Sequence, residues 1–116
     1  MRTVVVIEDD PAIAGALRAM LEESFAVATV LEPAAIAAEL DPAMVITDLM
    51  SPAGYDPGEA LRTVREIRAR TGAPVLVLTA HAEALGDAAL ARETQAVLSK
   101  PFDMDVLLAT VEELTA

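Results

Sequence analysis

Short apolar runs recur along the chain, with polar or charged residues directly after them. Five of these runs are rich in β-branched residues and almost continuously apolar, which is typical of strands buried on both faces of a parallel sheet. Between them, apolar residues recur three or four positions apart, as at Ile13, Leu17 and Leu21, and indicate amphipathic helices. The predicted strands are 3–7, 27–31, 44–47, 74–79 and 96–99.

Several helix ends are marked by residues that cap helices. Asp10 stands directly before Pro11, so its carboxylate can accept hydrogen bonds from the first turn while the proline occupies the first helical position. Asp103 offers a similar start for the last helix. Gly72 predicts the end of the helix that contains Leu61, Val64 and Ile67.

Two further segments have weaker helical patterns. Residues 33–40 begin with the favourable pair Glu32-Pro33, but the segment is short and rich in alanine. Gly86 interrupts the segment 82–92. We expect a helix in each segment, with ends that the pattern does not define.

Strand and helix alternate five times with short links between them. This order predicts right-handed crossovers and one doubly wound α/β fold around a five-stranded parallel sheet. No linker or repeat interrupts the 116 residues, so we expect a single domain over 1–116. Because 54% of the residues are hydrophobic but only 3% are aromatic, the core is expected to consist of aliphatic side chains.

The charge of the chain narrows the classes of partner. A formal net charge of -11 argues against direct nucleic-acid binding, because a polyanion would be repelled. The one arginine cluster, Arg62, Arg65, Arg68 and Arg70, is interpreted as a solvated helix face. The chain has no cysteine, no signal-peptide pattern and no run of about 18 apolar residues. We therefore expect a cytoplasmic protein without membrane insertion.

Polar side chains cluster where the predicted strands end. Glu8 and Asp9 follow the first strand, Asp48 the third, and Thr79 ends the fourth; Lys100 follows the fifth. The carboxyl ends of parallel strands share one edge of a sheet, where such folds bind ligands. Taken singly, these residues are more typical of caps, turns and loops, and Asp10 is assigned to helix capping. Their occurrence together at successive strand ends favours a site.

The chemistry of this residue set points to phosphoryl transfer. Clustered carboxylates repel one another, and a hard cation such as Mg²⁺ relieves the repulsion through oxygen ligands. A lysine and a threonine hydroxyl could contact phosphoryl oxygens, while a carboxylate serves as the nucleophile.

From its third residue to its last helix, the chain resembles the receiver domains of two-component response regulators. The resemblance implies a flavodoxin-like (βα)5 fold with strand order 2-1-3-4-5. It also implies that Asp48, in the run Val45 to Pro52, is the phosphoacceptor. Mg²⁺ would be held by Asp9 and Asp48 directly, by Glu8 mainly through water, and by the backbone carbonyl of Met50.

The resemblance assigns two more residues to the phosphoryl group. Thr79 matches the hydroxyl residue that contacts it after modification, and Lys100 matches the lysine of the family, which is followed by a cis bond to Pro101. The phosphoryl donor would be a sensor histidine kinase or a phosphotransfer protein. Because no output domain is evident in the sequence, we expect the signal to pass by contact with a downstream protein target. Homodimer formation is left open.

Two features depart from the family pattern, Val97 and the loop after Pro52, and His81 occupies a position of interest. Val97 stands where receivers commonly carry an aromatic residue that moves together with the threonine. His81 occupies a position that tunes hydrolysis of the phospho-aspartate in the family, and a modulating role and an exposed loop histidine are equally compatible with the sequence. The loop after Pro52 is longer than usual by about two residues. Tyr55 is expected in that loop, and Phe102 in the core.

Two rival functions remain at this point. A degenerate receiver would bind partners constitutively, and Val97 is the one feature that supports it. A Mg²⁺-dependent phosphohydrolase with an aspartyl-phosphate intermediate, resembling the haloacid dehalogenase family, would carry a second Asp at the position of Met50. We therefore expect a signalling phosphoacceptor rather than an enzyme.

Overall fold

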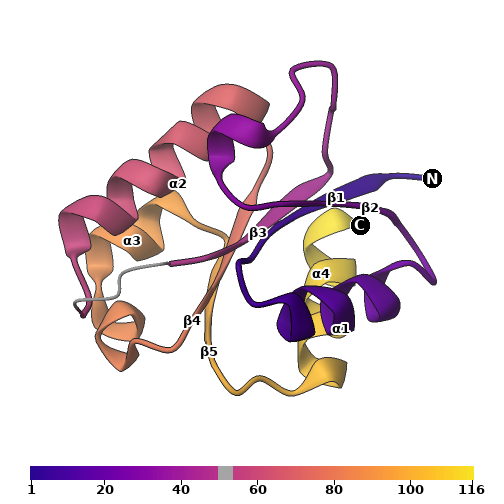
Figure 1. Cartoon of the computed structure of the whole chain (residues 1–116). Helices are drawn as coiled ribbons and strands as arrows, with labels where there is room; N and C mark the ends of the chain where they lie inside the picture. Colours follow the sequence, from indigo (N-terminus) through magenta and orange to yellow (C-terminus); the bar gives the residue numbers. More distant parts are fainter. Residues whose placement is uncertain (50–53) are drawn as a thin grey trace.

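A five-stranded parallel sheet in the order β2-β1-β3-β4-β5 forms the centre of the molecule, as the resemblance implied (Figure 1). The computed structural model describes residues 1–49 and 54–116. The strands agree with the predicted runs to within one residue at each end. They are β1 (Thr3–Ile7), β2 (Ala26–Val30), β3 (Met44–Asp48), β4 (Val75–Thr79) and β5 (Ala96–Ser99).

The register of the sheet aligns the ends of its strands. Val45 of β3 lies between Val5 of β1 and Val75 of β4, and all three side chains are fully buried. At the carboxyl edge, Asp48 pairs with Leu78 and Thr79 pairs with Ser99. The last residues of neighbouring strands therefore lie side by side, and the polar residues that follow them share one edge.

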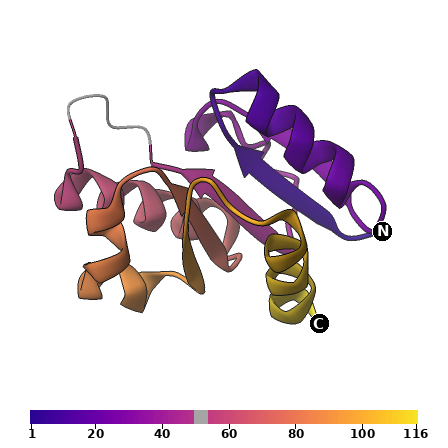
Figure 2. The same ribbon diagram turned by 90° about the horizontal axis from the view of Figure 1, so that it is seen from below.

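Helices cover both faces of the sheet (Figures 1 and 2). Helices α1 (Pro11–Leu21) and α4 (Met104–Thr115) pack on one face, and α2 (Pro57–Thr71) and α3 (Ala88–Glu93) pack on the other. The two faces carry separate aliphatic clusters, because successive residues of a strand point to opposite sides. Within the described ranges, no helix is both long and apolar enough to cross a membrane.

The helix ends predicted at Asp10, Gly72 and Asp103 are confirmed. Asp10 accepts hydrogen bonds from the backbone amides of Ala12, at 2.9 Å, and Ile13, at 3.4 Å. Asp103 caps α4 in the same way. Gly72 ends α2 in the left-handed region, with φ of 67°.

The segment 33–40 does not form the predicted helix. It contains only the 3-10 turn η1 (Pro33–Ala35), because Glu32 provides no side-chain cap and Ile36 is already extended, with φ of -70° and ψ of 123°. The side chain of Ile36 is buried in the core cluster on the α2 side of the sheet. Burial of this residue takes the place of a continued helix.

The segment 82–92 forms two short elements in place of one helix. The 3-10 helix η2 (Ala82–Gly86) ends at the glycine that interrupts the pattern, and Asp87 then caps α3. The arginine cluster is exposed, as predicted, and two of its members also form ion pairs between helices, since Arg65 and Arg68 of α2 both pair with Glu93 of α3. These two side chains link the helices and are not simply solvated.

Gly72 provides a test of the local backbone argument. We expect Gly72→Ala to lower the free energy of unfolding by about 1 kcal/mol, because a Cβ is unfavourable at positive φ. Gly15→Ala is the matched control, since Gly15 is exposed in α1 and its Cβ would meet nothing within 4 Å. That substitution should raise stability by about 0.5–1 kcal/mol. Urea unfolding followed by circular dichroism measures both values, and a loss of equal size in both variants would contradict the argument.

Candidate functional site

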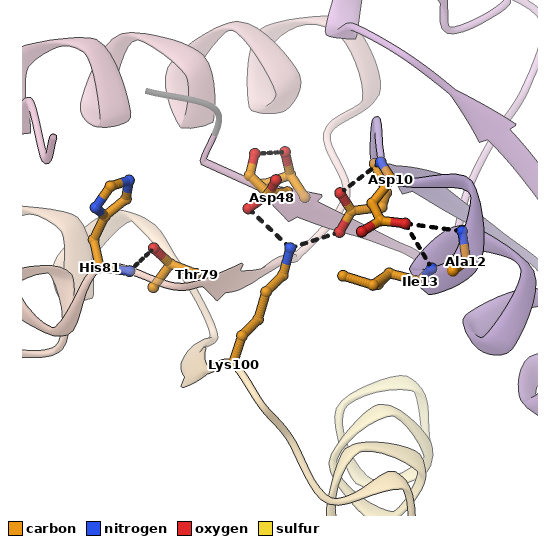
Figure 3. Close-up of polar contacts among 9 residues, drawn as sticks. Asp10, Ala12, Ile13, Asp48, Thr79, His81 and Lys100 are labelled. Atoms are coloured by element: carbon orange, nitrogen blue, oxygen red, sulfur yellow. Dashed lines mark hydrogen bonds and ion pairs between the residues drawn. The ribbon is translucent and has the colours of Figure 1, made fainter. Parts of the chain in front are cut away.

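The carboxyl edge of the sheet brings Lys100 between two carboxylates (Figure 3). Its Nζ atom lies 2.7 Å from Oε1 of Glu8 and 3.3 Å from Oδ1 of Asp48. These residues follow or end β1, β3 and β5, so the side chain of Lys100 extends from the edge strand past β4 to the centre of the sheet. The other carboxylate oxygen of Glu8 accepts a hydrogen bond from the backbone amide of Asp10, at 3.2 Å.

Three carboxylates converge beside this lysine. Glu8, Asp9 and Asp48 each offer one oxygen, and these three oxygens lie within 4.8 Å of one another. Glu8 is buried, Asp48 is half-buried and Asp9 is exposed, so the cluster opens to solvent on the Asp9 side. A set of oxygen donors open to water on one side fits Mg²⁺, which retains several of its waters when it binds.

The electrostatics of the site follow from the burial of Glu8. Burial raises the pKa of Glu8 above its ordinary value of 4.5, although the hydrogen bond from Lys100 opposes the shift. Burial alone would lower the pKa of Lys100, but the hydrogen bond to Glu8 and the charge of Asp48 outweigh it, so the pKa of Lys100 is raised. Lys100 is therefore held in its charged form.

Thr79 lies at the same edge and is fully buried. Its hydroxyl oxygen accepts a hydrogen bond from the backbone amide of His81, at 2.9 Å, and its carbonyl accepts one from the backbone amide of Lys100, at 2.8 Å. The backbone thus links the threonine directly to the lysine. His81 is half-buried, and its ring points away from Lys100 (Figure 3).

The remaining predicted residues are placed as follows. The Lys100–Pro101 bond is cis, as the resemblance implied. Val97 packs against the core cluster on the α2 side, and Phe102 packs against the other cluster. Met50, whose carbonyl was predicted as a metal ligand, lies outside the described residues.

One polar contact near the site was not foreseen. The hydroxyl of Tyr55 donates a 2.6 Å hydrogen bond to Oδ2 of Asp87. Sequence reasoning placed Tyr55 in a loop and did not consider Asp87 at all. Asp87 follows Gly86 and precedes a short apolar pattern, so its capping role could have been read from the chain, whereas its pairing with a tyrosine so distant in sequence could not.

Comparison with known proteins identifies the family. The model of the response regulator receiver domain matches residues 4–112. The KDP operon transcriptional regulatory protein KdpE of Escherichia coli is 33% identical over 114 residues, covering 94% of this chain and 49% of that protein. The chain thus spans about half the length of this curated relative.

Solved structures share the same fold. The response regulator TrrA of Thermotoga maritima, solved in complex with Mg²⁺-BeF, has a TM-score of 0.77 at 24% identity. The match covers 98% of this chain and 99% of the TrrA chain. The N-terminal receiver domain of a Bacteroides fragilis response regulator has a TM-score of 0.81 at 22% identity, covering 100% and 98%. The sequence matches and the site at the sheet edge agree, and the chain belongs to the response regulator receiver domain family.

Proposed function

We propose that Asp48 accepts a phosphoryl group from a sensor histidine kinase or a phosphotransfer protein, in a Mg²⁺-dependent reaction. The observation that carries this proposal is the position of Lys100, whose ammonium lies 3.3 Å from Asp48 and is anchored by Glu8 at 2.7 Å. A buried carboxylate that holds a cation beside a second carboxylate is arranged to stabilise negative charge on a group attached there.

Each side chain has a distinct part in the reaction. A carboxylate oxygen of Asp48 attacks phosphorus as the bond to the donor nitrogen of a phosphohistidine breaks. Lys100 offsets the charge on the phosphoryl oxygens, and Glu8 keeps the ammonium of Lys100 in position. Thr79 would donate its hydroxyl proton to a phosphoryl oxygen. His81, whose backbone amide bonds to the Thr79 hydroxyl, would modulate the later hydrolysis of the phospho-aspartate.

Glu8, Asp9 and Asp48 would hold the metal ion. Their donor set fits Mg²⁺ because all three ligands are carboxylate oxygens and Asp9 keeps the cluster accessible to water. When bound, Mg²⁺ neutralises charge on the transferring phosphoryl group.

The modified aspartate would act through a partner. Adding negative charge at the sheet edge shifts the protein between conformations that a downstream protein distinguishes, which is a shift of populations within one fold. The placement of the Lys100 ammonium between the carboxylates of Glu8 and Asp48 favours this function over a constitutive binding module, because binding alone requires no lysine between two acids.

The intact mass of the protein after incubation with acetyl phosphate and Mg²⁺ tests the function. We expect one added phosphoryl group on the wild-type protein and none on Asp48→Asn, which keeps the shape of the side chain but lacks a nucleophilic carboxylate. Glu59→Asn is a control, because Glu59 is an exposed acid of α2 that pairs only with Arg62 among the ion pairs of the described residues. An adduct that survives in Asp48→Asn would overturn the assignment, and an absent adduct in the wild type would favour the binding module.

A further inference from the structure

Three segments that are distant in the sequence meet at the side chain of Tyr55. This residue lies between β3 and α2, is half-buried, and donates its hydroxyl to Asp87 at 2.6 Å. Its ring lies against the ring of His81, with 6.1 Å between the centroids and an angle of 43° between the planes. Tyr55 thus joins the segment after Asp48 to the segment after Thr79 and to the start of α3.

Both carboxylate oxygens of Asp87 are engaged. Oδ1 accepts hydrogen bonds from the backbone amides of Ala89 and Leu90, each at 3.1 Å, and so caps α3. Oδ2 accepts the hydroxyl of Tyr55. The hydrogen bond from Tyr55 lowers the pKa of Asp87, while burial and the same bond raise the pKa of Tyr55. Because Leu90 is fully buried, the tyrosine is connected to the packed first turn of the helix.

The other side of the contact leads to the phosphoryl site. The backbone amide of His81 donates to the hydroxyl oxygen of Thr79 at 2.9 Å (Figure 3). If this hydroxyl turns toward a phosphoryl group on Asp48, the amide of His81 loses its acceptor. A shift of His81 toward a new acceptor would then take away the surface against which the ring of Tyr55 packs.

We propose that Tyr55 is a positioning residue whose hydrogen bond to Asp87 holds the first turn of α3 while Asp48 is unmodified, and that phosphorylation weakens this bond. The inference rests on the function proposed above. Coupling of this kind is reciprocal, so removing the hydrogen bond favours the phosphorylated conformation. Tyr55 acts through His81 and Asp87, and takes no part in the transfer itself.

The wild-type protein reports on this contact without a label. Tyr55 is its only tyrosine and it has no tryptophan, so its fluorescence near 300 nm arises from this one ring. A hydrogen bond to a carboxylate quenches tyrosine fluorescence. We expect the fluorescence to rise when beryllofluoride and Mg²⁺ are added, and amide hydrogen exchange at Ala89 and Leu90 to accelerate. Asp48→Asn should show neither change.

Substitution separates the hydroxyl from the ring. Tyr55→Phe keeps the packing against His81 and removes the hydrogen bond, and we expect it to bind beryllofluoride about fivefold more tightly in ¹⁹F NMR titrations. Asp87→Asn should have a similar effect, because asparagine still caps α3 but is a weaker acceptor for Tyr55. The double variant should bind no more tightly than either single variant. Asp103→Asn is the matched control, since Asp103 caps α4 through Asp105 and Val106 in the same geometry.

The outcomes distinguish this inference from the function beneath it. If the wild-type protein binds no beryllofluoride and gains no phosphoryl group, the proposed function itself is wrong. A wild-type protein that binds beryllofluoride with unchanged tyrosine fluorescence, and with equal affinity in Tyr55→Phe, overturns the role of Tyr55 alone. Independent, additive effects of Tyr55→Phe and Asp87→Asn would also overturn it, because the two residues would then not act through one bond.

Discussion

Lys100→Met should slow phosphoryl uptake from acetyl phosphate by about 100-fold or more. Methionine matches the length of the lysine side chain but cannot stabilise charge beside Asp48, from which the ammonium is 3.3 Å distant. Lys100 is the only lysine of the chain. The initial rate of appearance of the phosphorylated mass measures the effect.

The same variant should also be less stable. The Glu8 side chain, 2% exposed, would lose its cation, and we expect the free energy of unfolding of the metal-free protein to fall by about 3 kcal/mol at pH 7. The loss should diminish as the pH falls toward 4.5, the ordinary pKa of Glu8. Because burial raises the pKa of Glu8, the folded state binds its proton more tightly than the unfolded chain, so acidification favours folding. Urea unfolding followed by circular dichroism at pH 7 and at about pH 5 measures both effects.

Two controls separate charge from position. Arg62→Met removes one positive charge from an exposed pair on α2, and should change stability by less than about 0.5 kcal/mol with no effect on the rate. Combining Glu8→Gln with Lys100→Met should recover most of the free energy of unfolding, because the buried unpaired charge is gone. The rate of phosphoryl uptake should stay low, because Asp48 still lacks a cation beside it. A normal rate in Lys100→Met would remove the lysine from the mechanism.

Mg²⁺ should stabilise the wild-type protein but not Asp9→Asn. A ligand that binds only the folded state at about 100 times its dissociation constant contributes about 2.7 kcal/mol. Asp9 is the exposed member of the carboxylate cluster, so replacing it removes one proposed ligand without disturbing the pairing of Glu8 with Lys100. Chelation of Mg²⁺ should abolish phosphoryl uptake in the wild type. Urea unfolding with and without Mg²⁺ measures the stabilisation.

The neighbouring residue supplies the control for this experiment. Asp10→Asn removes the same charge one position later and still caps α1, because asparagine is as good a cap as aspartate. It should retain most of the stabilisation by Mg²⁺. If Asp9→Asn and Asp10→Asn lost the stabilisation by Mg²⁺ equally, the binding of Mg²⁺ would depend on the net charge of this region and not on the carboxylate cluster.

Local patterns predicted the elements whose signal lies within a short stretch of sequence. The strand runs were correct to within one residue, since they are continuous apolar stretches that only a covered sheet can bury. The caps at Asp10 and Asp103 and the end at Gly72 were correct because capping depends on a few adjacent residues. Residues 33–40 failed for the opposite reason: burial of Ile36 against the sheet outweighs a short run of alanines.

The grouping of the site residues was also predictable. A parallel sheet brings its strand ends together whatever the details of packing, so Glu8, Asp9, Asp48, Thr79 and Lys100 were expected at one edge, and they lie there. The assignment of a role to each residue came from the family resemblance.

The sequence by itself therefore determined the strands, the main caps and the edge at which the acids and the lysine meet, because each depends on periodicity or on neighbours along the chain. Only the tertiary structure decided that Lys100 bonds to Glu8 as well as Asp48, that Arg65 and Arg68 reach Glu93, and that Tyr55 bonds to Asp87. Those contacts join residues from separate elements, and their formation depends on helix placement and side-chain direction, which no pattern along one segment specifies.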